Sequence, residues 1–198
     1  MKFGSSTRVG GFRETLTEAL KHGLCDARRV TLLGSTGSIG TQAVQVIEHL
    51  ARLAGTTVDA EDAPLKVTAI SAGSRSLELL AQQAVRVRAE LVATSGTAQD
   101  AQRLQEYLDA AARSVGISGY SPRIVWGERA SVEAAAHPAD VVLNGITGSI
   151  GLEPTLTALK AGYRVALANK ESLIAGGPLV RAAVDASPLE TPMVPVDS

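Results

Sequence analysis

A glycine-rich loop, Gly34–Gly40 (GSTGSIG), carries residue types suited to binding phosphate. It follows an apolar run and precedes a helical pattern, which is the context that a dinucleotide-binding loop requires. Glycine lets the backbone turn sharply and approach a pyrophosphate, and the unpaired amides at a helix start attract its charge. Because the spacing departs from G-x-G-x-x-G, a structural turn capped by Thr36 or Ser38 stays open as the alternative.

A second loop, Gly145–Gly151 (GITGSIG), repeats the first almost letter for letter after another apolar run. It could form a second phosphate-binding loop. It could also form a tight strand-to-helix turn that contacts a cofactor through its backbone alone. Of these two interpretations we favour the turn.

A basic segment, Gly73-Ser74-Arg75, follows the second apolar run, where an NAD-specific site would place an acid on the ribose hydroxyls. No acid is present there. The guanidinium of Arg75 matches a phosphate in a bidentate fork, so the segment favours the 2′-phosphate of NADPH over the free ribose of NADH. The alternative is a solvent-exposed arginine at a helix start.

Three polar residues, Asn169, Lys170 and Glu171, combine an amide, a cation and an anion directly after a further apolar run. Charges beside a buried strand end usually have a partner or a ligand. Lys170 could bind a substrate oxygen or stabilise developing negative charge. The segment could equally be a surface helix start with Glu171 on its dipole, and the residues alone leave both interpretations open.

Short β-branched runs alternate with longer Ala/Leu-rich stretches along most of the chain, which is the pattern of strand and crossover helix in a parallel sheet. Most of the runs are apolar on both faces, so helices should cover both sides and give a three-layer α/β fold with a mostly parallel sheet. The expected strands are Val30–Leu33, Val67–Ala72, Leu91–Thr94, Ile124–Trp126, Val141–Leu143, Arg164–Ala168 and Met193–Val196.

The polar and glycine-rich segments all follow strands, so we expect them at the carboxyl edge of the sheet, where open α/β sheets bind ligands. The first crossover helix should begin near Ser38. Its stripe of packed residues is expected to be Ile39, Ala43, Val46, Ile47 and Leu50. Residues 51–64 are expected to form a surface insertion before the second strand.

The composition indicates one folded domain, or one domain and a fragment of another. The chain has 198 residues, of which 45% are hydrophobic and 20% charged, so disorder of the whole is excluded. A net charge of −1 provides no general polycation for a nucleic-acid backbone. The single cysteine, Cys25, permits no internal disulfide and fits a reducing compartment.

Residues 1–28 differ from the rest in mixing Gly, Ser and Arg with three acids. They hold no apolar run long enough for a signal peptide or a membrane span. We treat them as a leader of unknown role, followed by one domain over residues 29–198. The expected location is cytoplasmic, with no membrane or nucleic-acid partner.

These residues resemble the 1-deoxy-D-xylulose 5-phosphate reductoisomerase family of non-mevalonate isoprenoid biosynthesis. Gly34–Gly40 is similar to its NADPH loop, Leu167–Leu173 (LANKESL) to its most distinctive signature, and Pro195–Ser198 (PVDS) to the start of its metal site. The similarity runs from about Arg29 to Ser198. It implies a Rossmann-like fold and the NADPH-dependent conversion of 1-deoxy-D-xylulose 5-phosphate to 2-C-methyl-D-erythritol 4-phosphate.

The resemblance also implies roles for individual residues. The pyrophosphate side of the cofactor would be held by Thr36, Gly37, Ser38 and Ile39. The adenosine phosphate would lie at Gly73, Ser74 and Arg75, and the nicotinamide half near Asn169 and Glu171. Lys170 is the expected catalytic residue and would touch the sugar phosphate together with Ser198. Asp197 would ligate Mg²⁺ or Mn²⁺, for which carboxylate oxygen is a suitable donor.

Three features depart from the family pattern. The chain stops at Ser198, where the family continues with a Glu and a catalytic domain, so we expect an N-terminal fragment that binds NADPH and turns over no substrate by itself. Ser74-Arg75 stands where many members carry Lys-Asn. The leader precedes a strand that often opens the family's chains. Full-length relatives form homodimers, and the residues do not decide this for the present chain.

Other classes of protein are tested by their own motifs. A short-chain dehydrogenase needs Tyr-x-x-x-Lys, and none of Tyr107, Tyr120 and Tyr163 has a lysine four residues later. A phosphoryl-transfer protein needs G-x-x-x-x-G-K-[ST], and neither glycine loop is followed by lysine. A non-catalytic NADP(H)-binding or interaction module stays open as the alternative to the reductoisomerase.

Overall fold

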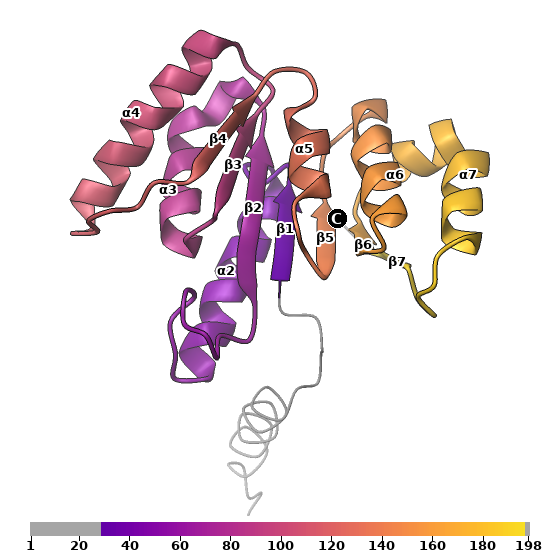
Figure 1. Ribbon diagram of the computed structural model, residues 1–198, viewed down its shortest axis with the longest axis horizontal. Helices are drawn as coiled ribbons and strands as arrows, with labels where there is room; N and C mark the ends of the chain where they lie inside the picture. The colour runs from indigo at the N-terminus through magenta and orange to yellow at the C-terminus, as the bar shows by residue number, and fades with distance from the viewer. Residues whose placement is uncertain (1–28, 197–198) are drawn as a thin grey trace, which may run out of the picture.

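One parallel sheet of seven strands runs through the computed structural model, which describes residues 29–196 (Figure 1). The strand order is β4-β3-β2-β1-β5-β6-β7, and every neighbouring pair is parallel. The strands are β1 (Arg29–Leu33), β2 (Lys66–Ala72), β3 (Leu91–Thr94), β4 (Arg123–Trp126), β5 (Val141–Asn144), β6 (Arg164–Leu167) and β7 (Met193–Pro195). All seven predicted strands are confirmed, each with ends within one residue of the prediction.

Helices cover both faces of this sheet, as Figure 1 shows. The helices are α2 (Ser38–Leu53), α3 (Leu77–Val87), α4 (Ala98–Ser114), α5 (Ala130–Ala136), α6 (Leu152–Lys160) and α7 (Lys170–Asp185), with short 3₁₀ turns η1 (Ser74–Ser76) and η2 (Ser149–Gly151). Leu32 packs in the core beneath α2, α3 and α4, whereas the next residue, Leu33, packs in the core beneath α5, α6 and α7. Successive strand residues point to opposite faces, so strands that are apolar throughout require helices on both sides. The three-layer α/β prediction is confirmed.

The first helix begins at Ser38 as predicted, but its buried stripe differs from the prediction. The buried residues of α2 are Gly40, Val44, Ile47 and Ala51, while Val46 is 54% exposed. A Cβ on Gly40 would lie 2.3 Å from the Cα of Ser35, so this glycine faces the loop before the helix and sets which side is covered. The prediction is confirmed for Ile47, but it missed Val44, Ala51 and Gly40, the last because a glycine carries no apolar side chain to mark a buried position.

The expected surface insertion over residues 51–64 is also only partly correct. Helix α2 continues to Leu53, and both Ala51 and Ala63 are buried in the core. Between them the chain is held by its own polar contacts, such as the bond from Thr56 Oγ1 to Asp62 Oδ1 at 2.9 Å. The segment is therefore anchored to the core at both ends, by Ala51 and by Ala63.

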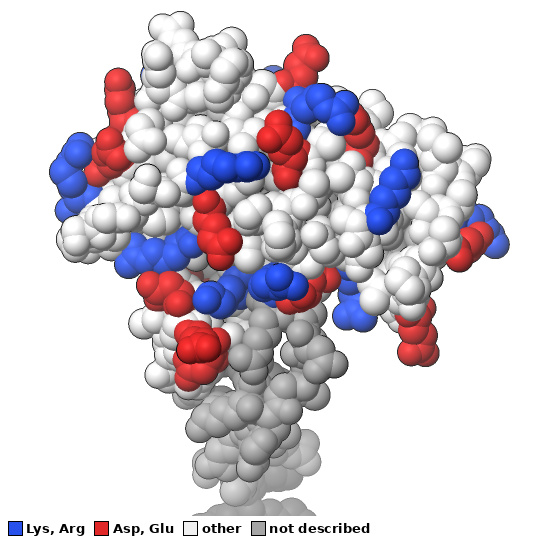
Figure 2. Space-filling model, viewed as in Figure 1, with Lys and Arg blue, Asp and Glu red and all other residues white. Residues whose placement is uncertain are grey.

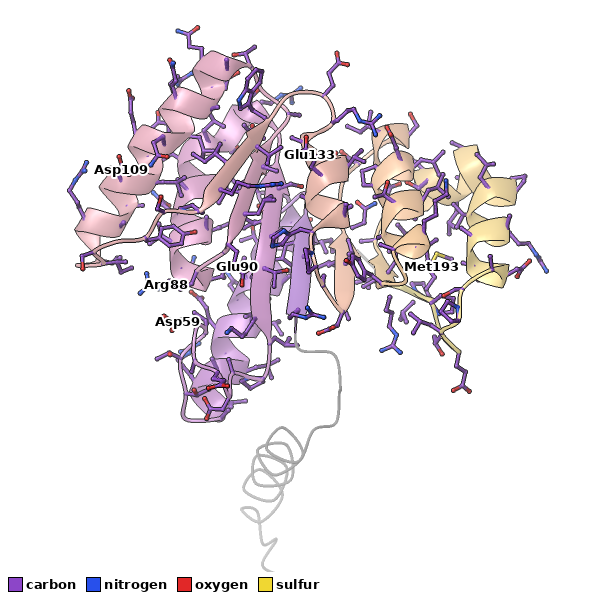
Figure 3. The ribbon with its side chains drawn as sticks, viewed as in Figure 1. Asp59, Arg88, Glu90, Asp109, Glu133 and Met193 are labelled. Atoms are coloured by element: carbon purple, nitrogen blue, oxygen red, sulfur yellow. The ribbon has the colours of Figure 1, made fainter. Side chains whose placement is uncertain are left out.

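Charged side chains of both signs are interspersed over the face shown in Figure 2. At the start of β1, the Arg29 guanidinium donates to Asp140 Oδ1 at 2.7 Å, and this hydrogen bond and the carboxylate charge raise the pKa of Arg29. Figure 3 labels a second pair, Arg88 and Asp59, whose Nε and Oδ2 atoms are 3.4 Å apart. Within residues 29–196, no helix combines the length and the apolar character needed to cross a membrane.

Candidate functional site

A cavity of about 650 Å³ opens at the carboxyl edge of the sheet. Its volume lies within the range of roughly 300–1,000 Å³ that is typical of small-molecule sites. Four separated segments, at the ends of the neighbouring strands β1, β5, β6 and β7, line it. They are Gly37, Ser38 and Ile39; Gly145, Ile146 and Thr147; Leu167, Ala168, Asn169, Lys170, Glu171 and Leu173; and Met193, Pro195 and Val196.

The first glycine loop is folded by bonds to the neighbouring strand β2. The amides of Gly34 and Ser35 both donate to the carbonyl oxygen of Ser71 at 2.9 Å, and the amide of Gly37 donates to Gly34 O at 3.1 Å. Gly34 has a φ of 77°, and a Cβ there would lie 2.8 Å from the carbonyl carbon of Gly145. A glycine is therefore required at this position, because the two loops approach each other backbone to backbone.

The start of α2 faces the cavity without a side-chain cap. Gly37 is the N-cap residue, and neither Thr36 nor Ser38 caps the helix. Within residues 29–196, no acceptor is present for the amides of Ser38 and Ile39. The first amides of a helix have no partner inside it, so these two are available to an anion in the cavity. This arrangement differs from the capped structural turn that the sequence left open.

The second glycine loop presents a different part of itself to the cavity. Gly145, Ile146 and Thr147, next to the strand, line the cavity, whereas the start of the following helix does not. In this loop the left-handed residue is Gly148, with a φ of 81°, and Ile150 is 75% exposed. The arrangement supports the turn interpretation, in which the loop offers its backbone to a ligand but no helix start.

Two buried asparagines hold the second loop. The Nδ2 group of Asn169, a residue only 2% exposed, donates to the carbonyl oxygens of Ile146 and Gly148, the latter at 2.8 Å. Its Oδ1 accepts from the amide of Ser172 at 3.0 Å and so caps α7. Asn144 donates to the carbonyl of Gly151 at 2.9 Å and accepts from the amide of Ile146 at 3.1 Å. Both amide hydrogens of Asn169 are thus directed at the loop.

Lys170 and Glu171 begin α7 directly after this cap, and both are exposed at the cavity. Neither forms an ion pair with another residue in the described part of the chain. A free ammonium group at the mouth of a cavity can bind an anionic ligand. The structure is consistent with both interpretations that the sequence left open, the ligand-binding lysine and the helix start.

Gly73, Ser74 and Arg75 lie after β2, the neighbour of β1 on the side away from β5. All three are exposed, and they do not line the cavity. A Cβ on Gly73 would meet only Ser95 Oγ, at 3.8 Å, so the backbone here has open space around it. The segment is therefore at the same sheet edge as the cavity and adjacent to it. Asp197 and Ser198 lie outside the described residues.

Gln83 supports the site from behind the first loop and was not among the residues predicted from the sequence. Its side chain is 1% exposed, and its Nε2 donates to the carbonyl oxygen of Ser35 at 2.9 Å. The available signal was a polar residue among the apolar ones of α3, but the sequence does not show where such an amide points.

A family model described as 1-deoxy-D-xylulose 5-phosphate reductoisomerase matches residues 30–177. The chain belongs to the 1-deoxy-D-xylulose 5-phosphate reductoisomerase family. The reductoisomerase of Arthrobacter sp. (strain FB24) is 53% identical over 171 residues, which are 86% of this chain and 39% of the relative. That of Kitasatospora griseola is 46% identical over 172 residues, or 85% of this chain and 39% of the relative.

Solved structures of reductoisomerases have the same fold. The reductoisomerase from Zymomonas mobilis in complex with NADPH is 35% identical with a TM-score of 0.70, over 87% of this chain and 39% of that one. A reductoisomerase in complex with NADPH, fosmidomycin and magnesium is 26% identical with a TM-score of 0.66, over 86% of this chain and 36% of that one. The chain thus spans about two fifths of the length of the reductoisomerases it matches.

Proposed function

We propose that this chain is the NADPH-binding part of an enzyme that converts 1-deoxy-D-xylulose 5-phosphate to 2-C-methyl-D-erythritol 4-phosphate. The observation that carries the proposal is the uncapped start of α2, which presents the unpaired amides of Ser38 and Ile39 to a cavity. Membership of the reductoisomerase family and the NADPH complex of the 35% identical relative support the choice of ligand.

The order of the candidate groups along the sheet suits an extended dinucleotide. Arg75 follows β2, the loop that holds Ser38 follows β1, and Glu171 follows β6, while the strand order is β2-β1-β5-β6. We place the 2′-phosphate at Gly73, Ser74 and Arg75, and the pyrophosphate at Thr36, Gly37, Ser38 and Ile39. The nicotinamide half then lies towards Asn169 and Glu171. Because the side chain of Asn169 binds the second loop, its contribution is to hold that wall of the cavity.

The bound cofactor supplies the hydride that reduces the rearranged sugar phosphate. Lys170 is the proposed catalytic residue, and its exposed ammonium group would bind the substrate phosphate and stabilise negative charge that develops during the reaction. Ser198 is proposed as a second contact to this phosphate. The second loop and the apolar residues Met193 and Val196 would form the wall of the cavity beside the reacting groups.

A divalent cation, Mg²⁺ or Mn²⁺, is part of the proposal, with Asp197 as the ligand from this chain. Carboxylate oxygen is the donor these hard cations prefer. Asp197 follows β7 and Val196, and Val196 lines the cavity. Among residues 29–196, no three His, Cys, Asp or Glu side chains come together in a way that could hold a metal. A cytoplasmic location is part of the proposal, whereas the homodimer expected of full-length relatives is not assigned to this chain.

A titration of the purified 198-residue chain with NADPH and NADH tests the cofactor assignment. Binding is measured by the fluorescence of the reduced nucleotide. We expect the affinity for NADPH to be at least about tenfold higher than that for NADH, because one charge-assisted hydrogen-bonded pair contributes about that much. Arg75→Met should remove this preference, while Arg113→Met, an exposed arginine at the end of α4, should keep it. Binding of neither nucleotide would favour the interaction module. Analysis of sugar phosphates in the same preparation tests the expectation that the chain alone forms no product.

A further inference from the structure

Gln83 is a buried primary amide that links α3 to the first glycine loop. Its Nε2 is 2.9 Å from Ser35 O and 3.5 Å from Thr41 Oγ1, and the side chain is 1% exposed. Ser35 belongs to the loop, and Thr41 to the first turn of α2. One amide group therefore contacts both the loop and the helix whose start faces the cavity.

Packing alone does not account for an amide at this position. The surrounding buried residues of α3 are apolar, among them Leu80, Ala84 and Val87. The Oε1 atom of Gln83 has no hydrogen-bond partner in the described part of the chain. A buried polar atom without a partner destabilises the folded state, so an apolar side chain would pack here at lower free energy.

The peptide groups on both sides of Ser35 are held by this contact and by strand β2. The Ser35 amide donates to Ser71 O at 2.9 Å, and the Ser35 carbonyl accepts from Gln83 at the same distance. Two residues further on, Gly37 is the N-cap of α2, whose first amides are unpaired among the described residues. The orientation of those amides depends on the path of the chain through Ser35.

We propose that Gln83 is a positioning residue, which fixes the Ser35 carbonyl so that the amides of Ser38 and Ile39 are aligned in advance for a pyrophosphate. This inference rests on the proposed binding of NADPH. Helix α3 would then connect two parts of the nucleotide site, because the segment with Arg75 leads directly into its first turn. Groups aligned before binding improve affinity by reducing the loss of conformational freedom.

The test compares Gln83→Met with Gln82→Met in the full 198-residue chain. Methionine has a similar length and no hydrogen-bond donor, and Gln82 is the exposed neighbour on the same helix. Two ligands are titrated: NADPH, and adenosine 2′-monophosphate, which has the 2′-phosphate but no pyrophosphate. We expect Gln83→Met to weaken NADPH binding roughly five- to tenfold, as for the loss of one hydrogen bond, and to change adenosine 2′-monophosphate binding less than about twofold. Gln82→Met should leave both affinities unchanged.

Each other outcome has a definite meaning. Equal NADPH affinity of Gln83→Met and the wild type would overturn the positioning role and leave the proposed function intact. Equal weakening of both ligands would show a merely structural role and would also overturn it. A wild-type chain that binds no NADPH would refute the proposed function and the positioning role with it.

A measurement on the wild-type chain covers the case in which Gln83→Met does not fold. In the ¹⁵N–¹H spectrum of the ligand-free chain, the side-chain amide hydrogens of Gln83 should already exchange slowly with solvent, as expected of a buried donor, whereas those of the exposed Gln82 should exchange fast. If the Gln83 amide hydrogens exchange as fast as those of Gln82 without ligand and become protected only when NADPH is added, the loop is not aligned in advance and the inference is wrong.

Discussion

The two glycine loops differ in a single letter, Ser35 against Ile146, and yet they fold differently. In the first loop the left-handed residue is Gly34, and α2 begins directly at Ser38. In the second loop it is Gly148, and a 3₁₀ turn precedes α6. Only the first loop directs a helix start at the cavity. Seven nearly identical residues therefore do not by themselves form a phosphate site.

The difference comes from the partners of each loop. The first is held by the backbone of β2 through Ser71 and by the side chain of Gln83, which leaves the amides at the helix start unpaired. The second is held through its carbonyl groups by Asn144 and Asn169. A glycine-rich segment can follow several backbone paths, and the donors and acceptors around it select one.

The largest predicted effect distinguishes the first glycine of each loop. Gly34→Ala should lower the free energy of unfolding by about 3 kcal/mol or more, because it adds a left-handed alanine and a methyl group 2.8 Å from the backbone of Gly145. Gly145→Ala should lower it by less than about 1 kcal/mol, since its φ is not positive and the nearest atom to a Cβ there is 3.5 Å away. Urea unfolding of both variants gives the comparison. Equal losses would mean that the loops do not differ as described.

A smaller effect is expected from Asn169→Asp. The carboxylate keeps an acceptor for the Ser172 amide but loses both donors and faces the carbonyl oxygens of Ile146 and Gly148. We expect a loss of about 2–3 kcal/mol in the free energy of unfolding. Ser172→Ala, in the same helix turn, removes a buried hydroxyl without a partner among the described residues and should be nearly neutral. A stable Asn169→Asp chain would show that the second loop needs no such support.

Much of the fold followed from the sequence because its signals are local. Strands such as Leu91–Thr94 are apolar on both faces, which requires a covered parallel sheet, and parallel strands bring their carboxyl ends to one edge. This is why the segments at Ser38, Ile146 and Lys170 could be expected together before the structure showed them around one cavity.

The details of the site depend on distant residues, and for that reason the sequence did not show them. Gln83 lies 48 positions from Ser35, and Asn169 lies 23 positions from Ile146. The presence of an Asn or Gln in the sequence does not reveal whether its side chain binds a ligand or a carbonyl group of the protein. The buried face of α2 was predicted incorrectly for another reason. It includes Gly40, which is buried because it has no side chain and so allows the backbone of Ser35 to approach.

The second glycine of each loop, Gly37 in the first and Gly148 in the second, should show the reverse order of sensitivity. Gly148→Ala has open space around its methyl group but a φ of 81°, so we expect a loss of about 1–2 kcal/mol in stability. Gly37 has an ordinary extended backbone, with a φ of −74°, and a Cβ there would lie 3.3 Å from Gly34 O, so Gly37→Ala should cost less than about 1 kcal/mol. Under the proposed function, however, Gly37→Ala places a methyl group where the pyrophosphate approaches. It should weaken NADPH binding, measured by fluorescence, while Gly148→Ala should not.

The smallest effect concerns α4, which follows β3 at the same sheet edge and supplies its own cap. The Asp100 carboxylate accepts from the Thr97 amide at 2.8 Å and from its hydroxyl at 3.0 Å, and these bonds lower the pKa of Asp100 below its ordinary 3.8. Because the pKa of Asp100 is lower in the folded state than in the unfolded state, the ionised carboxylate stabilises the folded state at pH values above 3.8. This stabilisation is lost as the pH falls through the lower pKa of the folded state.

The stability difference between the wild type and Asp100→Asn should therefore be present at pH 6 and shrink towards pH 3, as urea unfolding at both values would show. Pyrophosphate added at pH 6 should stabilise the wild type and Asp100→Asn equally. Of the two helix starts, that of α4 is capped, and that of α2 has unpaired amides facing the cavity, so the anion should bind at α2 in both proteins. A stability difference that is the same at both pH values would contradict the role of the Asp100 charge. The Thr97 hydroxyl still caps the residue-100 amide in this variant, so a larger pyrophosphate effect in Asp100→Asn would show that removing one negative charge from a helix start at this edge suffices to attract the anion.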